Sequence, residues 1–200
     1  QGDSTREKAN VEALVNKGID VLIICPHGGG EAVLEVKKWN AYDPRVGRQI
    51  LKDVNFELRK GEVVGFAGLM GSGRTEIAVS LFGNPDGYHV EGEIYVQGEE
   101  ASFKHPQDAI KAGIAYLSED RKAKGLILIQ DVKENVTLAN LREIAHRGTI
   151  DGNAEIKVAN DYRRSLNIKT PSIEQKVENL SGGNQQKVSL AKWLFVKPDV

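Results

Sequence analysis

The spacing of hydrophobic residues changes along the chain and divides it into segments of different expected structure. Residues 5–17 repeat apolar positions at helical spacing, and residues 19–25, which are apolar except for Asp20, predict a short buried strand. From residue 31 the period becomes two, with alternation over 33–36 and 54–58, and a further short strand is expected over 92–98. Alternation of this kind predicts an antiparallel β layer with one buried face.

The second half of the chain returns mostly to helical spacing. Residues 106–112 predict a helix, and the apolar residues 114–117 predict a buried strand. Residues 132–144 and 156–166 each place their apolar side chains on one stripe, as two amphipathic helices would. A last helix is expected to begin at Ser181.

The composition excludes several classes of protein but does not identify the function. Of the 200 residues, 40% are hydrophobic and 28% charged, and the net charge of −1 gives no argument for nucleic acid as a partner. Cys25 is the only cysteine, which excludes an intrachain disulfide and a cysteine-based zinc site. No stretch approaches the roughly 20 apolar residues of a membrane span. The first residues lack an initiator Met and signal-peptide character, so we expect them to lie inside a longer protein.

A glycine-rich stretch between an apolar run and a helix is the main candidate site. Residues 68–75 read G-L-M-G-S-G-R-T, after the apolar run 62–67 and before a helix expected over 75–82. Glycines let such a loop fold tightly and turn its N–H groups toward phosphate, and the threonine hydroxyl suits Mg²⁺. The alternative is a glycine-rich turn that binds no ligand. The candidate phosphate and Mg²⁺ ligands are Gly68, Gly71, Ser72, Gly73, Arg74 and Thr75.

Arg74 departs from the usual pattern, which has lysine at this position. Lysine is a compact and flexible charge, whereas arginine is longer, planar and always charged, so the two are not interchangeable at a phosphate site.

A second motif opens the last helix. Residues 180–187 read L-S-G-G-N-Q-Q-K, so that Ser181 is placed to cap the helix while Gly182 and Gly183 leave its first N–H groups uncovered. On its own this is equally well an ordinary Ser-Gly-Gly helix cap.

Together the two motifs resemble the phosphate-binding loop and the signature of the ABC transporter ATPases. The resemblance covers residues 31–200 and includes L-E-V-K-K-W at 34–39 and S-E-D-R-K at 118–122. These segments are similar to the monosaccharide-import ATPases, which carry two ATPase domains in one polypeptide, and arginine at position 74 resembles the second of those domains. The implied fold is α/β, a P-loop NTPase core of ABC type with an antiparallel β layer and a helical insertion at about 130–178.

The resemblance assigns roles to individual residues. Tyr42 falls where an aromatic ring stacks on adenine, although it is otherwise an ordinary surface aromatic. Glu119 falls where relatives have a glutamine that contacts Mg²⁺ and the attacking water, although it is otherwise a solvated loop acid. The loop residues listed above would hold ATP and Mg²⁺. Four signature residues would face ATP held by a second ATPase domain in a head-to-tail dimer: Ser181, Gly182, Gly183 and Gln185.

Arg74 and Glu119 together suggest an asymmetric pair of sites. The signature is intact, whereas the site built on Arg74 and Glu119 departs from the family pattern twice. We therefore expect this domain to supply its signature to an active site and to turn over ATP slowly at its own.

The ends of the sequence carry two further expectations. In the family an apolar strand ending in Asp-Glu, and later a switch histidine, follow the position of Val200, so a domain truncated there should hydrolyse little ATP by itself. Residues 1–27 resemble a helix–strand unit of periplasmic sugar-binding proteins, with a generic βα fragment as the alternative. The expected division is therefore 1–30 and 31–200. His27-Gly28-Gly29-Gly30 is interpreted as a loop, because the G-x-S-x-G elbow that accompanies an H-G-G-G oxyanion loop is absent from the sequence.

The function implied by the resemblance is ATP hydrolysis that powers import of a monosaccharide. The implied partners are a second ATPase domain, membrane permease subunits and, indirectly, a periplasmic sugar-binding protein. The implied location is the cytoplasmic face of the bacterial inner membrane. Two alternatives are a non-transport ABC ATPase, such as a DNA-repair or translation factor, and a sugar-binding module formed by the N-terminal residues.

Overall fold

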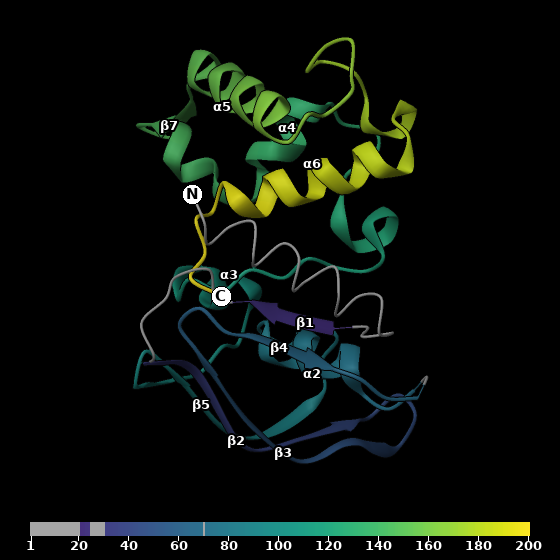
Figure 1. Ribbon diagram of the computed structural model, residues 1–200, viewed down its shortest axis with the longest axis vertical. Coiled ribbons are helices and arrows are strands. Elements are labelled where there is room, and N and C mark those ends of the chain that lie inside the picture. The colour runs from purple at the N-terminus through teal and green to yellow at the C-terminus, as the bar shows by residue number, and fades with distance from the viewer. Residues whose placement is uncertain (1–20, 25–30, 70) are drawn as a thin grey trace. The chain divides into compact units, whose positions relative to one another are not determined.

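The computed structural model describes residues 21–24, 31–69 and 71–200, which form two compact units (Figure 1). The first unit runs to Ile114 and includes Asp199 and Val200, and the second comprises Ala115–Pro198. The expected helix over 5–17, Cys25 and the loop at 27–30 lie outside the described residues.

An antiparallel sheet forms one layer of the first unit, as the alternating pattern predicted. Its strand order is β3-β2-β5-β6, with β2 at Ala32–Asp43, β3 at Arg48–Arg59, β5 at His89–Val96 and β6 at Glu99–Ala101. β2 and β3 are both longer than expected from the sequence. Lys38 and Asp53 adopt positive φ angles of 49° and 47° inside them, and the pairing register of β2 with β3 shifts near Lys38. A bulge of this kind breaks the alternation without ending the strand.

The glycine-rich stretch lies between a strand and a helix, as expected. β4 at Val63–Phe66 precedes it and pairs antiparallel with β1 at Val21–Ile24, and α2 at Arg74–Leu81 follows it. The sheet is fixed to this helix by a buried hydrogen bond, in which the indole Nε1 of Trp39 on β2 donates to the Ser80 hydroxyl on α2 at 2.9 Å.

The predicted helix near residue 106 is confirmed as α3, Pro106–Lys111, but the strand predicted at 114–117 is wrong. A strand exists by pairing its backbone with a neighbour, and these residues join no ladder in the part of the chain that the structure describes. Ile114 is buried, whereas Leu117 is 41% exposed.

The second unit is mainly helical. Its longer elements are α4 at Val132–Thr137, α5 at Gly152–Ser165 and α6 at Gly182–Leu194. Shorter elements are the π turn η1 at Arg121–Gly125, the 3₁₀ turns η2 at Leu138–Ile144 and η3 at Val177–Asn179, and the strands β7 at Ala145–His146 and β8 at Thr149–Ile150. The core of the unit consists of Leu126, Val132, Val136, Ile168, Val177, Leu180, Val188 and Ala191.

The single helix predicted over 132–144 is wrong, because it divides into α4 and η2. Asn140 interrupts it with φ −142° and ψ 49°, and its side-chain amide donates to the Phe195 carbonyl at 3.4 Å. Asparagine side chains favour such breaks because they offer hydrogen bonds outside the helix ladder. The helices predicted over 156–166 and from Ser181 are confirmed as α5 and α6. Of the helices in the described residues, none has the length and apolar character needed to cross a membrane.

Candidate functional site

The loop from Gly68 to Arg74 depends on glycine at particular positions of its backbone. Gly71 and Gly73 adopt φ angles of 79° and 89°, in the left-handed region where side chains cost energy. A Cβ atom at Gly68 would come within 2.7 Å of the Ser72 hydroxyl, and one at Gly73 within 2.7 Å of Leu51 Cδ2 and 3.0 Å of the Ile50 carbonyl oxygen. Glycine at 73 therefore lets the loop rest directly on β3.

Hydrogen bonds tighten this loop and lead it into α2. The Leu69 carbonyl accepts from the Ser72 N–H at 3.0 Å and from Arg74 Nη2 at 3.1 Å. The Gly73 carbonyl accepts the N–H of Ile77 at 2.9 Å, which closes the first turn of α2. The side chain of Arg74 thus folds back on the loop, whereas a phosphate-binding lysine points its charge at the ligand.

The residues present fit a nucleotide with Mg²⁺ in their chemistry. The loop places glycine and serine backbone at the start of an eight-residue helix, whose dipole favours an anion. Thr75 lies in the first turn of α2, where its hydroxyl is a suitable Mg²⁺ ligand. Within the described ranges, no three His, Cys, Asp or Glu side chains gather into a metal cluster. Thr75, together with the phosphates, would hold the ion.

Tyr42 lies on β2, close in the sheet to Leu51, the β3 residue that supports the loop. In the pairing of β2 with β3, Ala41 is opposite Leu51, the residue against which Gly73 packs. Tyr42 follows Ala41, is 41% exposed, and stacks on His89 of β5 with ring centroids 6.1 Å apart and 29° between the planes. Its position is compatible with a ring that stacks on a base.

The second motif forms the start of α6 in the second unit. Ser181 occupies the N-cap position without a side-chain cap bond, and its hydroxyl accepts from the Asn184 amide at 2.9 Å. Gly182 and Gly183 are exposed, and a Cβ at Gly183 would meet nothing within 4 Å. The first turn therefore presents backbone uncovered by side chains.

Gln185 is expected from the sequence to face a nucleotide, but the structure buries it to 4% exposure. Its Nε2 donates to the Val177 carbonyl at 3.0 Å, and its Oε1 accepts from Arg121 Nε at 3.4 Å. Gln185 therefore supports the first turn of α6 from its buried side. The sequence analysis missed Arg121, which lies in the segment at 118–122, and Asn184, which lies in the motif at 180–187.

Glu119 is exposed in the second unit, directly before the turn η1. The next residue, Asp120, caps that turn by accepting from the backbone N–H groups of Lys122 at 3.2 Å and Ala123 at 3.0 Å. The structure thus groups the loop and Tyr42 in the first unit, and Glu119 and the α6 start in the second. Their role in binding stays a prediction.

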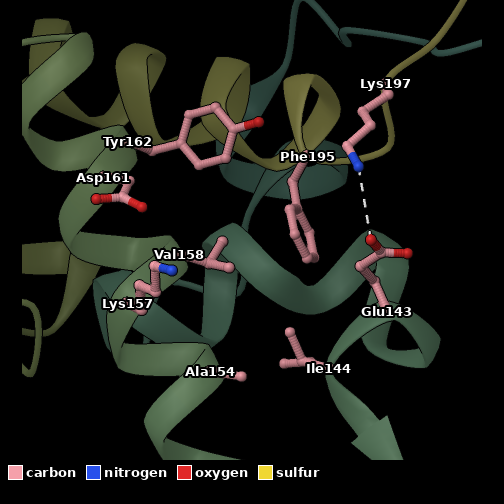
Figure 2. Close-up of a pocket in the computed structure, with 9 residues that line it drawn as sticks. All are labelled: Glu143, Ile144, Ala154, Lys157, Val158, Asp161, Tyr162, Phe195 and Lys197. Atoms are coloured by element: carbon pink, nitrogen blue, oxygen red, sulfur yellow. Dashed lines mark hydrogen bonds and ion pairs between the residues drawn. The ribbon is translucent and has the colours of Figure 1, made fainter.

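An open pocket of about 430 Å³ in the second unit is lined by other residues (Figure 2). Phe195 and Tyr162 form part of its wall, and Lys197 pairs with Glu143 at 3.5 Å on its rim. Burial raises the pKa of the Tyr162 phenol, so this side chain is neutral at physiological pH. None of the predicted site residues is among those that line the pocket.

Comparison with known proteins matches residues 51–200 to the ABC transporter family. The chain is 52% identical over 175 residues to the xylose import ATP-binding protein XylG of Thermoanaerobacter pseudethanolicus, covering 87% of this chain and 34% of that protein. It is 48% identical over 172 residues to the L-arabinose transport ATP-binding protein AraG of Geobacillus stearothermophilus, covering 86% and 34%. The chain therefore spans about a third of the length of these curated relatives.

Solved structures confirm the expected fold class. An ATP-binding cassette in a dimeric post-hydrolysis state with ADP and Pi matches with a TM-score of 0.62 at 23% identity, over 82% of this chain and 70% of that one. An ATP-binding cassette of an ABC transporter in its ADP conformation matches with a TM-score of 0.59 at 17% identity, over 84% and 66%. The fold is that of a P-loop NTPase of ABC type, and with three quarters of its length matched by the family model, the chain belongs to the ABC transporter family.

Proposed function

We propose that this chain is the nucleotide-binding part of an ATPase that powers import of a monosaccharide. The observation that carries the proposal is the loop Gly68–Thr75, whose Gly73 rests on β3 and whose end starts α2. Support for the transported class comes from relatives named as xylose import and L-arabinose transport ATP-binding proteins.

Each part of the loop has a chemical task in this proposal. The backbone around Gly71 and Gly73 and the start of α2 hold the phosphates of ATP, and the Thr75 hydroxyl ligates Mg²⁺. Tyr42 stacks on the adenine. Bound Mg²⁺ neutralises charge that develops on the phosphates during transfer. Glu119 contributes a carboxylate toward the ion and the attacking water.

The exposed start of α6 serves a different nucleotide. Ser181, Gly182 and Gly183 bind the phosphates of ATP held by a second ATPase domain, paired head to tail with this one. The assembly docks on membrane permease subunits at the cytoplasmic face of the inner membrane and is supplied by a periplasmic sugar-binding protein. This chain corresponds to the second ATPase domain of the monosaccharide-import type.

The site on this chain's own loop is the slower of the two in the proposed dimer. Arg74 Nη2 donates to the Leu69 carbonyl, which turns the planar guanidinium toward the loop, whereas a lysine would place a compact charge among the phosphates. Trapping of ADP at each site separately, in the assembled dimer, measures this. Faster turnover at the Arg74 site than at the other would contradict the asymmetry.

The main test uses the native gene product that carries these residues, reconstituted with its permease in vesicles. We expect Mg²⁺-dependent binding of a fluorescent ATP analogue and sugar uptake that depends on ATP. Thr75→Ala should weaken Mg²⁺-dependent binding about tenfold through loss of one metal ligand. Thr149→Ala, at an exposed threonine on β8, is the matched control and should bind as the wild type does. Equal binding by both variants, or uptake without ATP, refutes the proposal.

A further inference from the structure

We propose that Arg121 is a positioning residue that fixes the first turn of α6 through Gln185 and Gly182. The inference rests on the proposed function, because it assigns a task to Arg121 only if that turn binds a nucleotide. Arg121 lies 64 positions before Gln185 in the sequence, and both belong to the second unit.

The Gln185 amide is held in one orientation by its buried partners. This side chain is 4% exposed, so each of its polar atoms needs a partner within the protein. The Val177 carbonyl takes the N–H at 3.0 Å, and Arg121 Nε donates to the oxygen at 3.4 Å. Because an amide has distinct donor and acceptor ends, these two contacts allow only one orientation of the group.

Arg121 also packs closely against Gly182. A Cβ atom at residue 182 would lie 2.9 Å from Arg121 Nη2, closer than such atoms come in proteins. The guanidinium therefore occupies the space that any side chain at 182 would need. Glycine at position 182 therefore leaves room for the Arg121 side chain and also leaves the backbone exposed.

The turn that carries Arg121 is itself held against α6. Asp120 caps the turn η1 at its start, and at its end the buried Lys192 ammonium donates to the Gly125 carbonyl at 2.6 Å. A Cβ at Gly125 would lie 3.4 Å from the Ser189 hydroxyl, so the turn packs closely on the middle of the helix. Arg121 is thus held at a defined place along α6.

These contacts define what Arg121 does. It acts through Gln185 and the Gly182 backbone, and keeps the exposed N–H groups of the first turn aligned. Preorganised donors are effective only when they are already in place before the reaction. Loss of Arg121 should therefore lower turnover at the site which this turn completes. It should leave binding at the loop of this chain's own first unit unchanged.

The test compares Arg121→Gln and Arg121→Lys with Lys122→Gln in the native gene product assembled with its permease. Lys122 is exposed on the same turn and serves as the matched control. We expect kcat for ATP hydrolysis to fall about tenfold in Arg121→Gln and somewhat less in Arg121→Lys, which keeps the charge but loses the fork. The affinity of the loop for a fluorescent ATP analogue should stay within about twofold, and the control should match the wild type.

Two further measurements separate positioning from general stability. In Arg121→Gln, hydrogen exchange at the amides of Asn184 and Gln185, which donate to the Ser181 carbonyl, should accelerate while the rest of α6 keeps its protection. Adding Gln185→Met to Arg121→Gln should lower kcat no further than the worse single variant, because both act through one contact.

The outcomes are distinct. A native product that neither binds nor hydrolyses ATP refutes the proposed function, while exchange at Asn184 and Gln185 still reports on the contact. Hydrolysis at the wild-type rate in both Arg121 variants, or unchanged exchange, overturns the positioning role alone. The same holds if the control variant loses as much activity as Arg121→Gln, or if the effects of Arg121→Gln and Gln185→Met multiply.

Discussion

At the scale of single residues, Lys192 is unusual because its ammonium is buried in the second unit. The side chain is 7% exposed, donates to the Gly125 carbonyl at 2.6 Å and lies 4.7 Å from the centre of the Trp193 ring. Burial lowers its pKa below the ordinary value of 10.5, because removal from water disfavours the charged form.

A dependence of stability on pH follows from this shift. Between the lowered pKa of the folded state and 10.5, the unfolded chain binds more protons at this position than the folded chain does. The free energy of unfolding contributed by Lys192 therefore rises with pH across that window, by at most about 1.4 kcal/mol for each pH unit. Below the window the cost of burying the charge is fully present.

Lys192→Met should remove this contribution. Urea unfolding at several pH values approaching 10.5 should show a smaller rise, or a steeper fall, of the free energy of unfolding with pH in the variant than in the wild type. The exposed Lys169→Met is the control and should reproduce the wild-type slope. Parallel curves for the wild type and Lys192→Met would contradict the assignment.

Tyr42 gives a residue-scale prediction about nucleotide binding. If its ring stacks on adenine, Tyr42→Ala should weaken ATP binding about tenfold and Tyr42→Phe should change it little, because the π face is kept. Titration calorimetry with ATP measures both. Tyr95→Ala on β5 removes a ring of the same kind from another place in the sheet, and an equal loss in that variant would assign the effect to the sheet as a whole.

At the scale of elements, the junction of α2 with α3 depends on one glycine. Gly83 follows α2 with φ 69°, and a Cβ there would lie 2.2 Å from the carbonyl carbon of His105, the N-cap of α3. The two backbones therefore touch in a way that only glycine permits. Gly87 has a similar φ of 72°, but a Cβ there would meet nothing within 4 Å.

These two glycines form a matched pair for mutation. Gly87→Ala should cost about 1 kcal/mol of unfolding free energy, from the backbone conformation alone. Gly83→Ala adds a clash with backbone that has no flexible end to move, and should cost at least about 3 kcal/mol. Chemical denaturation of both variants provides the comparison. Equal losses would show that the α2–α3 junction yields to accommodate a side chain.

Elements with a strong local signal could be predicted, and those set by distant partners could not. The start of α6 at Ser181 was read correctly because serine and two glycines mark a helix start in the sequence itself. The full lengths of β2 and β3 were missed, since Lys38 and Asp53 carry no glycine signal for their positive φ angles. The contact of Arg121 with Gln185 also depends on packing across 64 residues, which no local pattern reveals.

At the scale of the whole molecule, the candidate binding residues belong to two separate units. The loop Gly68–Thr75 and Tyr42 belong to the first, while Glu119 and the start of α6 belong to the second. The sequence offers one tryptophan in each, Trp39 and Trp193, so the two units can be followed separately by fluorescence. ATP binding at the loop can therefore be tested unit by unit, without knowing which sugar is transported.

Binding of Mg²⁺–ATP at the loop should stabilise the first unit selectively. With Trp193→Phe, the remaining Trp39 reports the first unit; with Trp39→Phe, Trp193 reports the second. At a ligand concentration about 100 times Kd, the unfolding free energy of the unit that binds should rise by about 2.7 kcal/mol. We expect a shifted urea midpoint for Trp39 fluorescence and an unchanged one for Trp193. A midpoint shift seen only in Trp193 fluorescence would indicate that the nucleotide binds in the second unit and not at the loop. Equal shifts for both tryptophans would mean that the two units unfold as one.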